Sequence, residues 1–366
     1  MIMGFKVEIH PNKEQEEYLL YCCRVYHDMW NFLVAKFKDN LPNVGRHGLI
    51  GYSEKELRTE FICENIPSRL YRSILEVYAN SVRKVYQKVS RPPKFHKRNP
   101  NKQSFYIVDN DYTVDKKNRI NIPKYLSDFT ISKKISLSNL NLPKGVNVIS
   151  DVHYTYCKGK WYLSGCYKVD DVYINEDKNI LGLDWGVKNF YTDSNGKTYN
   201  YPKSVIREFQ RIKKLQSIMD KKVKGSNNYN KIKIRFNMAY ERMNNLKNNF
   251  IEQLTTELCK ENHIVIEDIN IKHFFNTNTK FIARYNIIQP KSRFDNKLEW
   301  KCQKFGSYFI KVNPNFTSKT CSNCGYIFKE LTLKDRIFNC PCCGQSVDRD
   351  INAAINIKNR GMDTLL

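Results

Sequence analysis

Four cysteines with a regular spacing are the residues that most clearly indicate chemistry. Two residues separate Cys321 from Cys324, two separate Cys340 from Cys343, and 15 separate the pairs. This spacing predicts a zinc ribbon with four thiolate ligands, and the glycine after each pair lets the backbone turn tightly around one ion. Cys342 lies between two ligands and is expected to point away, while unligated thiols are the alternative. A zinc ion with four protein ligands leaves no position for a reacting water, so catalysis requires other residues.

Three carboxylates stand in contexts typical of buried functional acids. Asp184 lies in the apolar run NILGLDWGV, Glu267 ends the apolar run HIVIE, and Asp350 opens the helical pattern DINAAINI, where it is predicted to cap the helix. Taken singly, each acid has a simpler interpretation, as a turn residue, a strand end and an N-cap respectively. A buried acid is costly unless a cation compensates it, so the three are expected to converge only if they bind metal.

Together these acids predict two-metal hydrolysis of a phosphodiester. One ion activates a water for in-line attack and the other stabilises the leaving oxygen. Oxygen ligands favour Mg²⁺ or Mn²⁺ over zinc. The sequence offers no Ser-His-Asp or Cys-His nucleophile pattern, and it has no GxxxxGK[ST] loop for ATP.

A basic segment and the overall charge indicate a nucleic-acid partner. The chain has 61 Lys and Arg against 37 Asp and Glu, a formal net charge of +24, which a polyanion would neutralise. The segment from Arg91 to Phe105 contains no acid, and its cations and rings suit phosphate contacts and base stacking. The candidate nucleic-acid-binding residues are Arg91, Lys94, Phe95, His96, Lys97, Arg98 and Lys102. A solvated basic linker is the alternative.

Other features of the composition indicate the cellular compartment of the protein. No apolar run is long enough to span a bilayer, and the N-terminus lacks the apolar core of a secretory signal. Seven of the 12 cysteines lie outside the Cys321–Cys343 region, in apolar or strand-like surroundings typical of reduced core residues. We therefore expect a cytoplasmic protein without a membrane partner, associated with the nucleoid when bound to DNA; a nuclear location would require a eukaryotic source.

Periodicity predicts the elements that must position these residues. A strand over 4–10 precedes helical patterns within 12–90, the first of which starts with a capping box at Asn12 and Gln15. Residues 103–168 indicate β-structure, with a hairpin through Lys158-Gly159-Lys160. If the first strand pairs with these later strands, the helices are an insertion into a small β-barrel. After an acidic linker, two long helices are predicted from about 203 to 222 and from 230 to 261.

With these residues assembled, the sequence resembles the TnpB proteins encoded by insertion sequences, relatives of type V CRISPR effector nucleases and of Fanzor proteins. The resemblance covers nearly the whole chain, from FKVEIHPNKEQEEYL and CCRVYHDMWN through PKFHKRNPNKQSF to the C-terminus. Its most specific motifs are LGLDWGVKNFYT, IVIEDINIKHF, TSKTCSNCG and FNCPCCGQSVDRDINAAINI.

The resemblance implies an RNA-guided DNA endonuclease that holds a guide RNA and cuts complementary double-stranded DNA beside a short motif. It implies a multidomain α+β fold: a β-barrel wedge domain (1–11 and 91–170), an inserted helical recognition domain (12–90), a RuvC-like nuclease domain of the RNase H fold (179–315 and 347–366) and an inserted zinc ribbon (316–346). The family's catalytic acids fall on Asp184, Glu267 and Asp350, which would bind Mg²⁺, and its zinc ligands fall on the four cysteines. The oligomeric state is left open.

Two other functions remain as alternatives. A DNA-binding repressor, guided or acting through the ribbon alone, is disfavoured because no acid of the triad is missing. A transposase of the RNase H fold is disfavoured because the ribbon lies between Glu267 and Asp350 and the front half is wedge-like. Asp348 is a rival to Asp350 within the string DRD, and the family pattern DxNAA favours Asp350.

Overall fold

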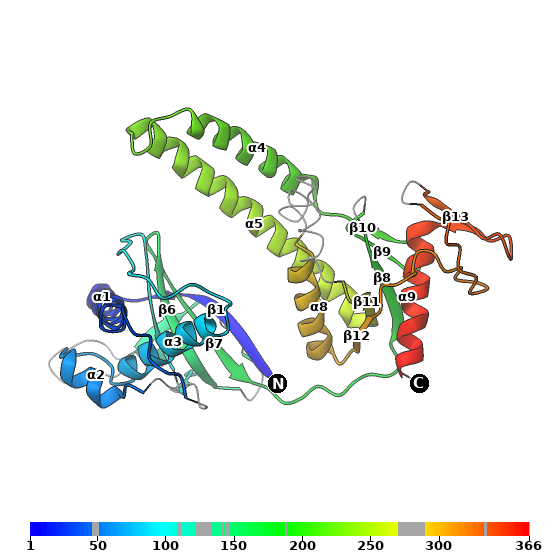
Figure 1. Cartoon of the computed structure of the whole chain (residues 1–366). Coiled ribbons are helices and arrows are strands. Elements are labelled where there is room, and N and C mark those ends of the chain that lie inside the picture. The colour runs from blue at the N-terminus through cyan, green and yellow to red at the C-terminus, as the bar shows by residue number, and fades with distance from the viewer. Residues whose placement is uncertain are drawn as a thin grey trace. The chain divides into compact units, whose positions relative to one another are not determined.

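The chain folds into two compact units, Met1–Asp171 and Val172–Leu366 (Figure 1). The computed structural model describes residues 1–365 apart from 46–50, 109–110, 122–133, 139, 141, 144–145, 187–188, 270–289 and 333–334. Among the described helices, none combines the length and the apolar composition needed to cross a bilayer.

The first unit is built on a seven-stranded antiparallel sheet. Its strand order is β2-β6-β7-β1-β5-β4, with β3 paired to β6. Residue Phe5 of β1 lies opposite Gly165 of β7, so the N-terminal strand pairs with the later strands as predicted, and the helices are inserted between β1 and β2. The elements are β1 (Ile2–His10), α1 (Lys13–Lys36), α2 (Glu54–Glu60), α3 (Arg69–Tyr86), β2 (Lys102–Ile107), β3 (Tyr112–Thr113), β4 (Arg119–Asn121), β5 (Lys134–Leu137), β6 (Val148–Cys157) and β7 (Lys160–Lys168).

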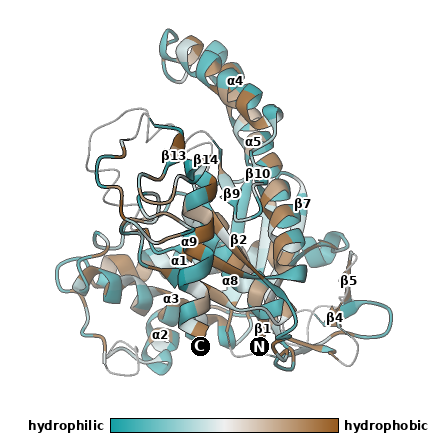
Figure 2. Ribbon diagram, turned by 90° about the vertical axis from the view of Figure 1, so that its right-hand side faces the viewer, coloured by the Kyte–Doolittle hydropathy of each residue, from teal (hydrophilic) through white to brown (hydrophobic). Residues whose placement is uncertain are grey.

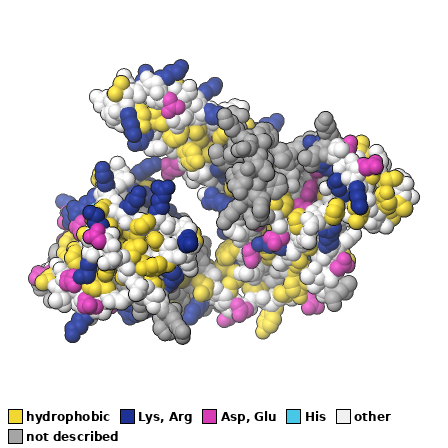
Figure 3. Space-filling model, viewed as in Figure 1, with side chains coloured by type: hydrophobic (Ala, Val, Ile, Leu, Met, Phe, Trp, Pro, Cys, Tyr) yellow, Lys and Arg dark blue, Asp and Glu magenta, His cyan; other side chains and the backbone are white. Residues whose placement is uncertain are grey.

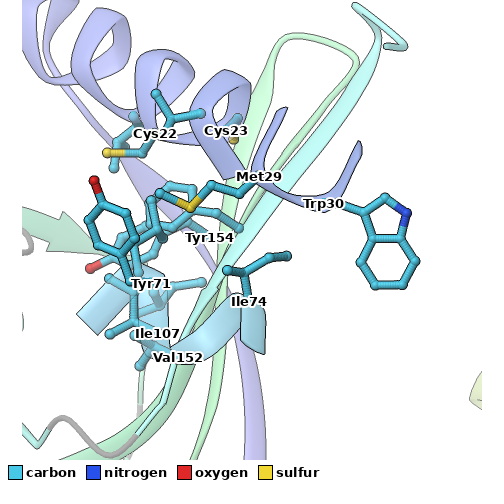
Figure 4. Close-up of a cluster of buried hydrophobic side chains, with 14 of the residues drawn as sticks. Cys22, Cys23, Met29, Trp30, Tyr71, Ile74, Ile107, Val152 and Tyr154 are labelled. Atoms are coloured by element: carbon cyan, nitrogen blue, oxygen red, sulfur yellow. The ribbon is translucent and has the colours of Figure 1, made fainter. Parts of the chain in front are cut away.

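The apolar sides of α1 and α3 pack onto this sheet. Cys22 and Met29 of α1 and Ile74 of α3 lie with Val152 and Tyr154 of β6 in one buried cluster (Figure 4). Burying these side chains provides the main stabilisation of the unit, at roughly 1.5–3 kcal/mol for each large apolar side chain. Cys22 is therefore an ordinary core residue, as its apolar surroundings predicted.

The local sequence pattern correctly predicted the start of α1, but it made the turn between β6 and β7 one residue too long. The Asn12 side chain accepts a hydrogen bond from the Gln15 amide, and the Gln15 side chain accepts one from the Asn12 amide, which confirms the capping box. The β6–β7 turn is one residue shorter than predicted, because Lys160 already pairs with Cys157. Lys158 and its neighbouring glycine both have positive φ, the geometry of a two-residue type I′ turn.

The second unit contains a five-stranded mixed sheet in the order β10-β9-β8-β11-β12. Strands β8, β11 and β12 run parallel, whereas β9 pairs antiparallel with β8 and β10. The elements are β8 (Asn179–Trp185), β9 (Tyr191–Asp193), β10 (Thr198–Tyr199), α4 (Lys203–Asp220), α5 (Asn227–Glu261), β11 (Asn262–Glu267), α8 (Lys291–Phe305), β12 (Phe309–Val312), β13 (Ile337–Asn339), β14 (Ser346–Asp348) and α9 (Arg349–Leu365). Helices α4 and α5 confirm the two long helices predicted. Apolar and polar residues alternate around α5 and α9, as expected of helices with one buried side (Figure 2).

Two glycines let α9 and the sheet approach each other closely. A Cβ atom on Gly182 of β8 would lie 2.2 Å from the Ala354 carbonyl oxygen, and a Cβ on Gly361 of α9 would lie 2.4 Å from a Val265 methyl group. Such distances are far below van der Waals contact. The absence of these side chains therefore lets α9 pack closely against β8, which carries Asp184, and against β11.

We expect Gly182→Ala to destabilise the second unit by roughly 2 kcal/mol or more, because the new methyl group meets helix backbone that cannot move aside independently. The measurement is thermal unfolding followed by intrinsic fluorescence. Gly51→Ala is the control, since nothing lies within 4 Å of its Cβ position. Equal melting temperatures for the two variants would contradict the close packing of α9 on β8.

Candidate functional site

The four predicted zinc ligands lie together in the second unit. All their Sγ atoms are within 4.8 Å of one another. Cys321 and Cys343 are 3.7 Å apart, and Cys324 and Cys340 are 3.6 Å apart. A tetrahedral ion with Zn–S bonds of about 2.3 Å requires sulfur–sulfur distances of about 3.8 Å. The donor set and its spacing therefore fit a structural zinc ion.

The backbone explains why both cysteine pairs face inward. The Gly325 amide donates to the Cys321 carbonyl and the Gly344 amide donates to the Cys340 carbonyl, each at 3.0 Å. These glycines have φ of 77° and 73°, in the left-handed region that disfavours other residues. Cys342 is exposed and lies outside the cluster, as predicted.

The sheet places two of the predicted acids side by side. Ile266 of β11 lies opposite Leu183 of the parallel strand β8, so Glu267 and Asp184 follow at the same level of adjacent strands. Asp350 comes from the first turn of α9, which packs against both strands. Three segments far apart in sequence thus bring their carboxylates to one end of the β8–β11 pair.

The three carboxylates influence one another electrostatically. Desolvation by burial raises the pKa of Asp184 well above its usual value, and the charges of Glu267 and Asp350 raise it further, whereas Arg349 lowers it. Burial also raises the pKa of Glu267, against the lowering effect of a hydrogen bond from Thr317. In the described part of the chain, the four cysteines are the one group of metal-ligating side chains that already lies close enough together to hold an ion. The all-oxygen donor set and mutual repulsion of the three carboxylates fit a divalent cation such as Mg²⁺.

Asp348, rather than Asp350, caps α9. The Asp348 side chain accepts hydrogen bonds from the amides of Asp350 at 2.9 Å and Ile351 at 3.3 Å. The prediction that Asp350 is the cap was therefore wrong: β14 ends in extended backbone at Asp348, the conformation that an N-cap requires. Asp350 lies inside the first turn, and an Asp350 oxygen lies 3.5 Å from the guanidinium of Arg349.

A buried ion pair beside the acids was not predicted. Lys291, at the start of α8, lies with its Nζ 2.5 Å from Asp295 Oδ2, and the Tyr191 hydroxyl donates to Asp295 Oδ1 at 2.6 Å. Lys291 is only 2% exposed, and its charge lowers the pKa of Glu267. The sequence carries no signal for this pair beyond an i, i+4 spacing, which occurs on many exposed helices.

The basic segment packs against α1 in the first unit. The His96 ring stacks on Trp30 with centroids 4.8 Å apart, and Trp30 Nε1 donates to the Lys94 carbonyl at 3.0 Å. Arg98 pairs with Asp28. A cavity of about 350 Å³ lies beside these contacts and includes Lys97 in its lining. One face of His96 is therefore already occupied, and Trp30, which the sequence reasoning did not single out, holds the segment in place.

The predicted nucleic-acid-binding residues are exposed. Phe95 is 56% exposed, and Arg91, Lys94, Lys97 and Lys102 are exposed too. Lys and Arg side chains are also spread over the surface of the first unit and of the α4–α5 hairpin (Figure 3). These positions suit contacts with a polyanion.

Two family models match the two parts of the chain that carry these residues. Residues 164–278 match the family model OrfB_IS605, described as "Probable transposase", and residues 292–357 match the "Cas12f1-like, TNB domain" model. The first range contains Asp184 and Glu267, and the second contains the four cysteines and Asp350.

Whole proteins match as well. A Streptomyces pristinaespiralis protein is 29% identical over 56% of this chain, and the chain spans 50% of that relative's length. InsQ of Escherichia coli is 23% identical, with 98% of this chain and 92% of InsQ covered. Both are named for RNA-guided DNA endonuclease activity. The chain in a cryo-EM structure of a Cas12f1–sgRNA–target DNA complex has the same fold, with a TM-score of 0.55, 14% identity and 99% of both chains covered.

These findings define a class: a mixed α+β protein with the Cas12f1-like fold and a four-cysteine cluster of the zinc-ribbon type. Within that class the chain is similar to the TnpB proteins of insertion sequences, through its match to the OrfB_IS605 model, to InsQ and to a TnpB-like protein of Acanthamoeba polyphaga mimivirus.

Proposed function

We propose that the chain is an RNA-guided DNA endonuclease of the TnpB type, which cuts guide-complementary DNA beside a short motif. The observation that carries the proposal is the meeting of Asp184, Glu267 and Asp350 at one end of β8 and β11, with no acid of the set replaced. The endonuclease names of the relatives and the complex of sgRNA and target DNA in the Cas12f1 structure support the same activity and partners.

The division of labour follows the two units. The first unit would supply the wedge-like barrel (1–11 and 91–170) and the helical recognition domain (12–90), which hold the guide RNA. The second unit would supply the RuvC-like nuclease of the RNase H fold (179–315 and 347–366) and the zinc ribbon (316–346). The five-stranded sheet with α9 against it and the four-cysteine cluster support this division.

At the reaction centre, Asp184, Glu267 and Asp350 would hold Mg²⁺ or Mn²⁺, while the four cysteines would hold zinc. When bound, the divalent ions supply an activated water and charge stabilisation at the leaving oxygen. The protein's own part is to orient the three carboxylates. Lys291 and Arg349 partly offset the effect of burial, because their positive charges lower the pKa of Glu267 and Asp184 respectively.

The proposal is tested by cleavage of a plasmid library with randomised flanks, using protein co-expressed with its native flanking locus, with and without Mg²⁺. We expect metal-dependent cuts at sites that match a co-purified RNA. Guide-matched binding without cuts would favour the repressor. Absence of any bound RNA would favour the transposase.

The raised pKa values of Asp184 and Glu267 predict that the stability of the metal-free chain depends on pH, and that bound metal removes this dependence. The folded, metal-free chain keeps protons on Asp184 and Glu267 that the unfolded chain releases near pH 4. The folded state then binds more protons, so stability falls as pH rises from that range up to the raised pKa values. In EDTA, the melting temperature of the wild type should fall with pH more steeply than that of Asp184→Asn. Parallel melting curves for the two proteins would contradict the prediction, and Mg²⁺ should protect the wild type more.

A further inference from the structure

The Glu267 carboxylate is held by a hydroxyl from the segment that leads into the cysteine cluster. Thr317 Oγ1 donates to Glu267 Oε1 at 2.5 Å, and both side chains are buried, at 4% and 8% exposure. The Pro314 carbonyl is a second acceptor for this hydroxyl at 3.1 Å. The single hydroxyl proton favours the shorter bond to the charged oxygen. Among the described residues, Thr317 is the one that donates a side-chain hydrogen bond to this carboxylate.

Thr317 is itself fixed by two buried asparagines of α9. Asn356 Nδ2 donates to the Thr317 carbonyl at 2.9 Å and to the Thr320 carbonyl at 2.6 Å. Asn352 Nδ2 donates to the Thr320 carbonyl at 2.7 Å, and Asn352 Oδ1 accepts from the Ser322 amide at 2.9 Å. Buried amides with these bonds in place hold a backbone firmly, because breaking any one leaves an unsatisfied polar group.

These bonds connect three parts of the second unit. Helix α9 carries Asp350 in its first turn and the two asparagines in the next turns. The segment that the asparagines hold runs from Thr317 to Ser322 and contains Cys321, the first cysteine of the cluster. A movement of the ribbon that displaced this segment would therefore also displace the Thr317 hydroxyl, which orients Glu267.

We propose that Thr317 is a positioning residue that orients the Glu267 carboxylate for a divalent cation, and that Asn352 and Asn356 couple it to the folded ribbon. This proposal rests on the proposed function of the three acids as cation ligands. Hydrogen-bond partners that orient metal-binding carboxylates affect metal affinity by about 10–100-fold in known sites. A role in stability alone would change the melting temperature and leave the affinity unaltered.

The test compares Thr317→Val, which removes the hydroxyl at nearly constant volume, with Thr317→Ser, which keeps it. Mn²⁺ binding to the RNA-bound full chain is measured from the loss of the free-ion EPR signal. The binding measured for the Asp184→Asn complex is subtracted, because it represents the ions bound to the RNA. Cleavage is measured against Mg²⁺ concentration in parallel. We expect the Mn²⁺ concentration at half-saturation to be about tenfold higher in Thr317→Val than in the wild type. In Thr317→Ser it should stay within about twofold of the wild-type value. Zinc content should stay at the wild-type value in both variants.

Each outcome decides the proposal. Wild-type Mn²⁺ affinity in a folded Thr317→Val variant overturns it, and so does a Thr317→Ser variant as weak as Thr317→Val. If Thr317→Val fails to fold, Thr317→Ala, which is less demanding sterically, is compared with Thr317→Ser under the same criteria. Wild-type chain that binds Mn²⁺ at the acids but does not cut DNA refutes the endonuclease while leaving the positioning role intact.

Discussion

Asp184→Ala is expected to abolish DNA cleavage while guide RNA and target binding persist. The substitution removes one of three proposed cation ligands, and the loss of several kcal/mol of charge stabilisation corresponds to a rate lower by about 1000-fold or more. Binding should persist because Asp184 belongs to the second unit, whereas the proposed guide-binding segment from Arg91 to Lys102 belongs to the first. The measurement pairs a plasmid-cleavage assay with electrophoretic mobility shifts on guide-matched DNA.

The two acids of the string DRD, Asp348 and Asp350, provide a matched control for the same experiment. We expect Asp350→Ala to lose cleavage as Asp184→Ala does, because Asp350 is the proposed ligand in the first turn of α9 and its charge acts on Asp184 more strongly than that of Asp348. Asp348→Ala should keep substantial cleavage and lose about 1 kcal/mol of stability, because Asp348 caps α9. The reverse result would make Asp348 the ligand. Loss of RNA binding in Asp184→Ala would contradict the division of labour between the units.

Cys321→Ser is expected to cost the chain its zinc and to unfold the ribbon. Structural zinc sites contribute roughly 10 kcal/mol or more of apparent binding free energy, most of which is folding free energy of the ribbon. The apolar core around this cluster is small, consisting chiefly of Leu331 and Phe338 with the cysteines, so it offers little compensation. Cleavage should fall as well, since Asn352 and Asn356 hold Thr317, which contacts Glu267, together with the segment that contains Cys321.

The measurements are zinc content by mass spectrometry, limited trypsin digestion at Lys319 and Lys329, and cleavage. Cys342→Ser is the matched control, because this exposed cysteine lies between two ligands without joining the cluster. It should keep zinc, protease resistance and activity. If a chain stripped of zinc both stayed folded and cut DNA as before, a structural role for the ribbon would be wrong.

Comparison of prediction with structure shows where local patterns sufficed. The capping box at Asn12 and Gln15, the strand ending at Glu267 and the long helix that ends at Glu261 were all predicted, because each depends on residues within a few positions of one another. The cysteine spacing predicted the cluster for the same reason, because each of two turns of fixed length brings two thiols close together. The candidate acids were found because buried acids in apolar runs are costly and therefore informative.

Tertiary structure decided the contacts that orient these residues. The bond from Thr317 to Glu267 spans 50 residues, and the stacking of His96 on Trp30 joins two segments with no shared periodicity. The sequence predicted Asp350 as the cap of α9, and only the end of β14 showed that Asp348 faces the helix amides instead. The sequence alone thus determined which residues have the right chemistry, whereas packing of α9 on the sheet determined which of them meet. The reason is that hydrogen bonds and charge interactions act over a few ångströms, and only the folded chain brings distant residues within that range.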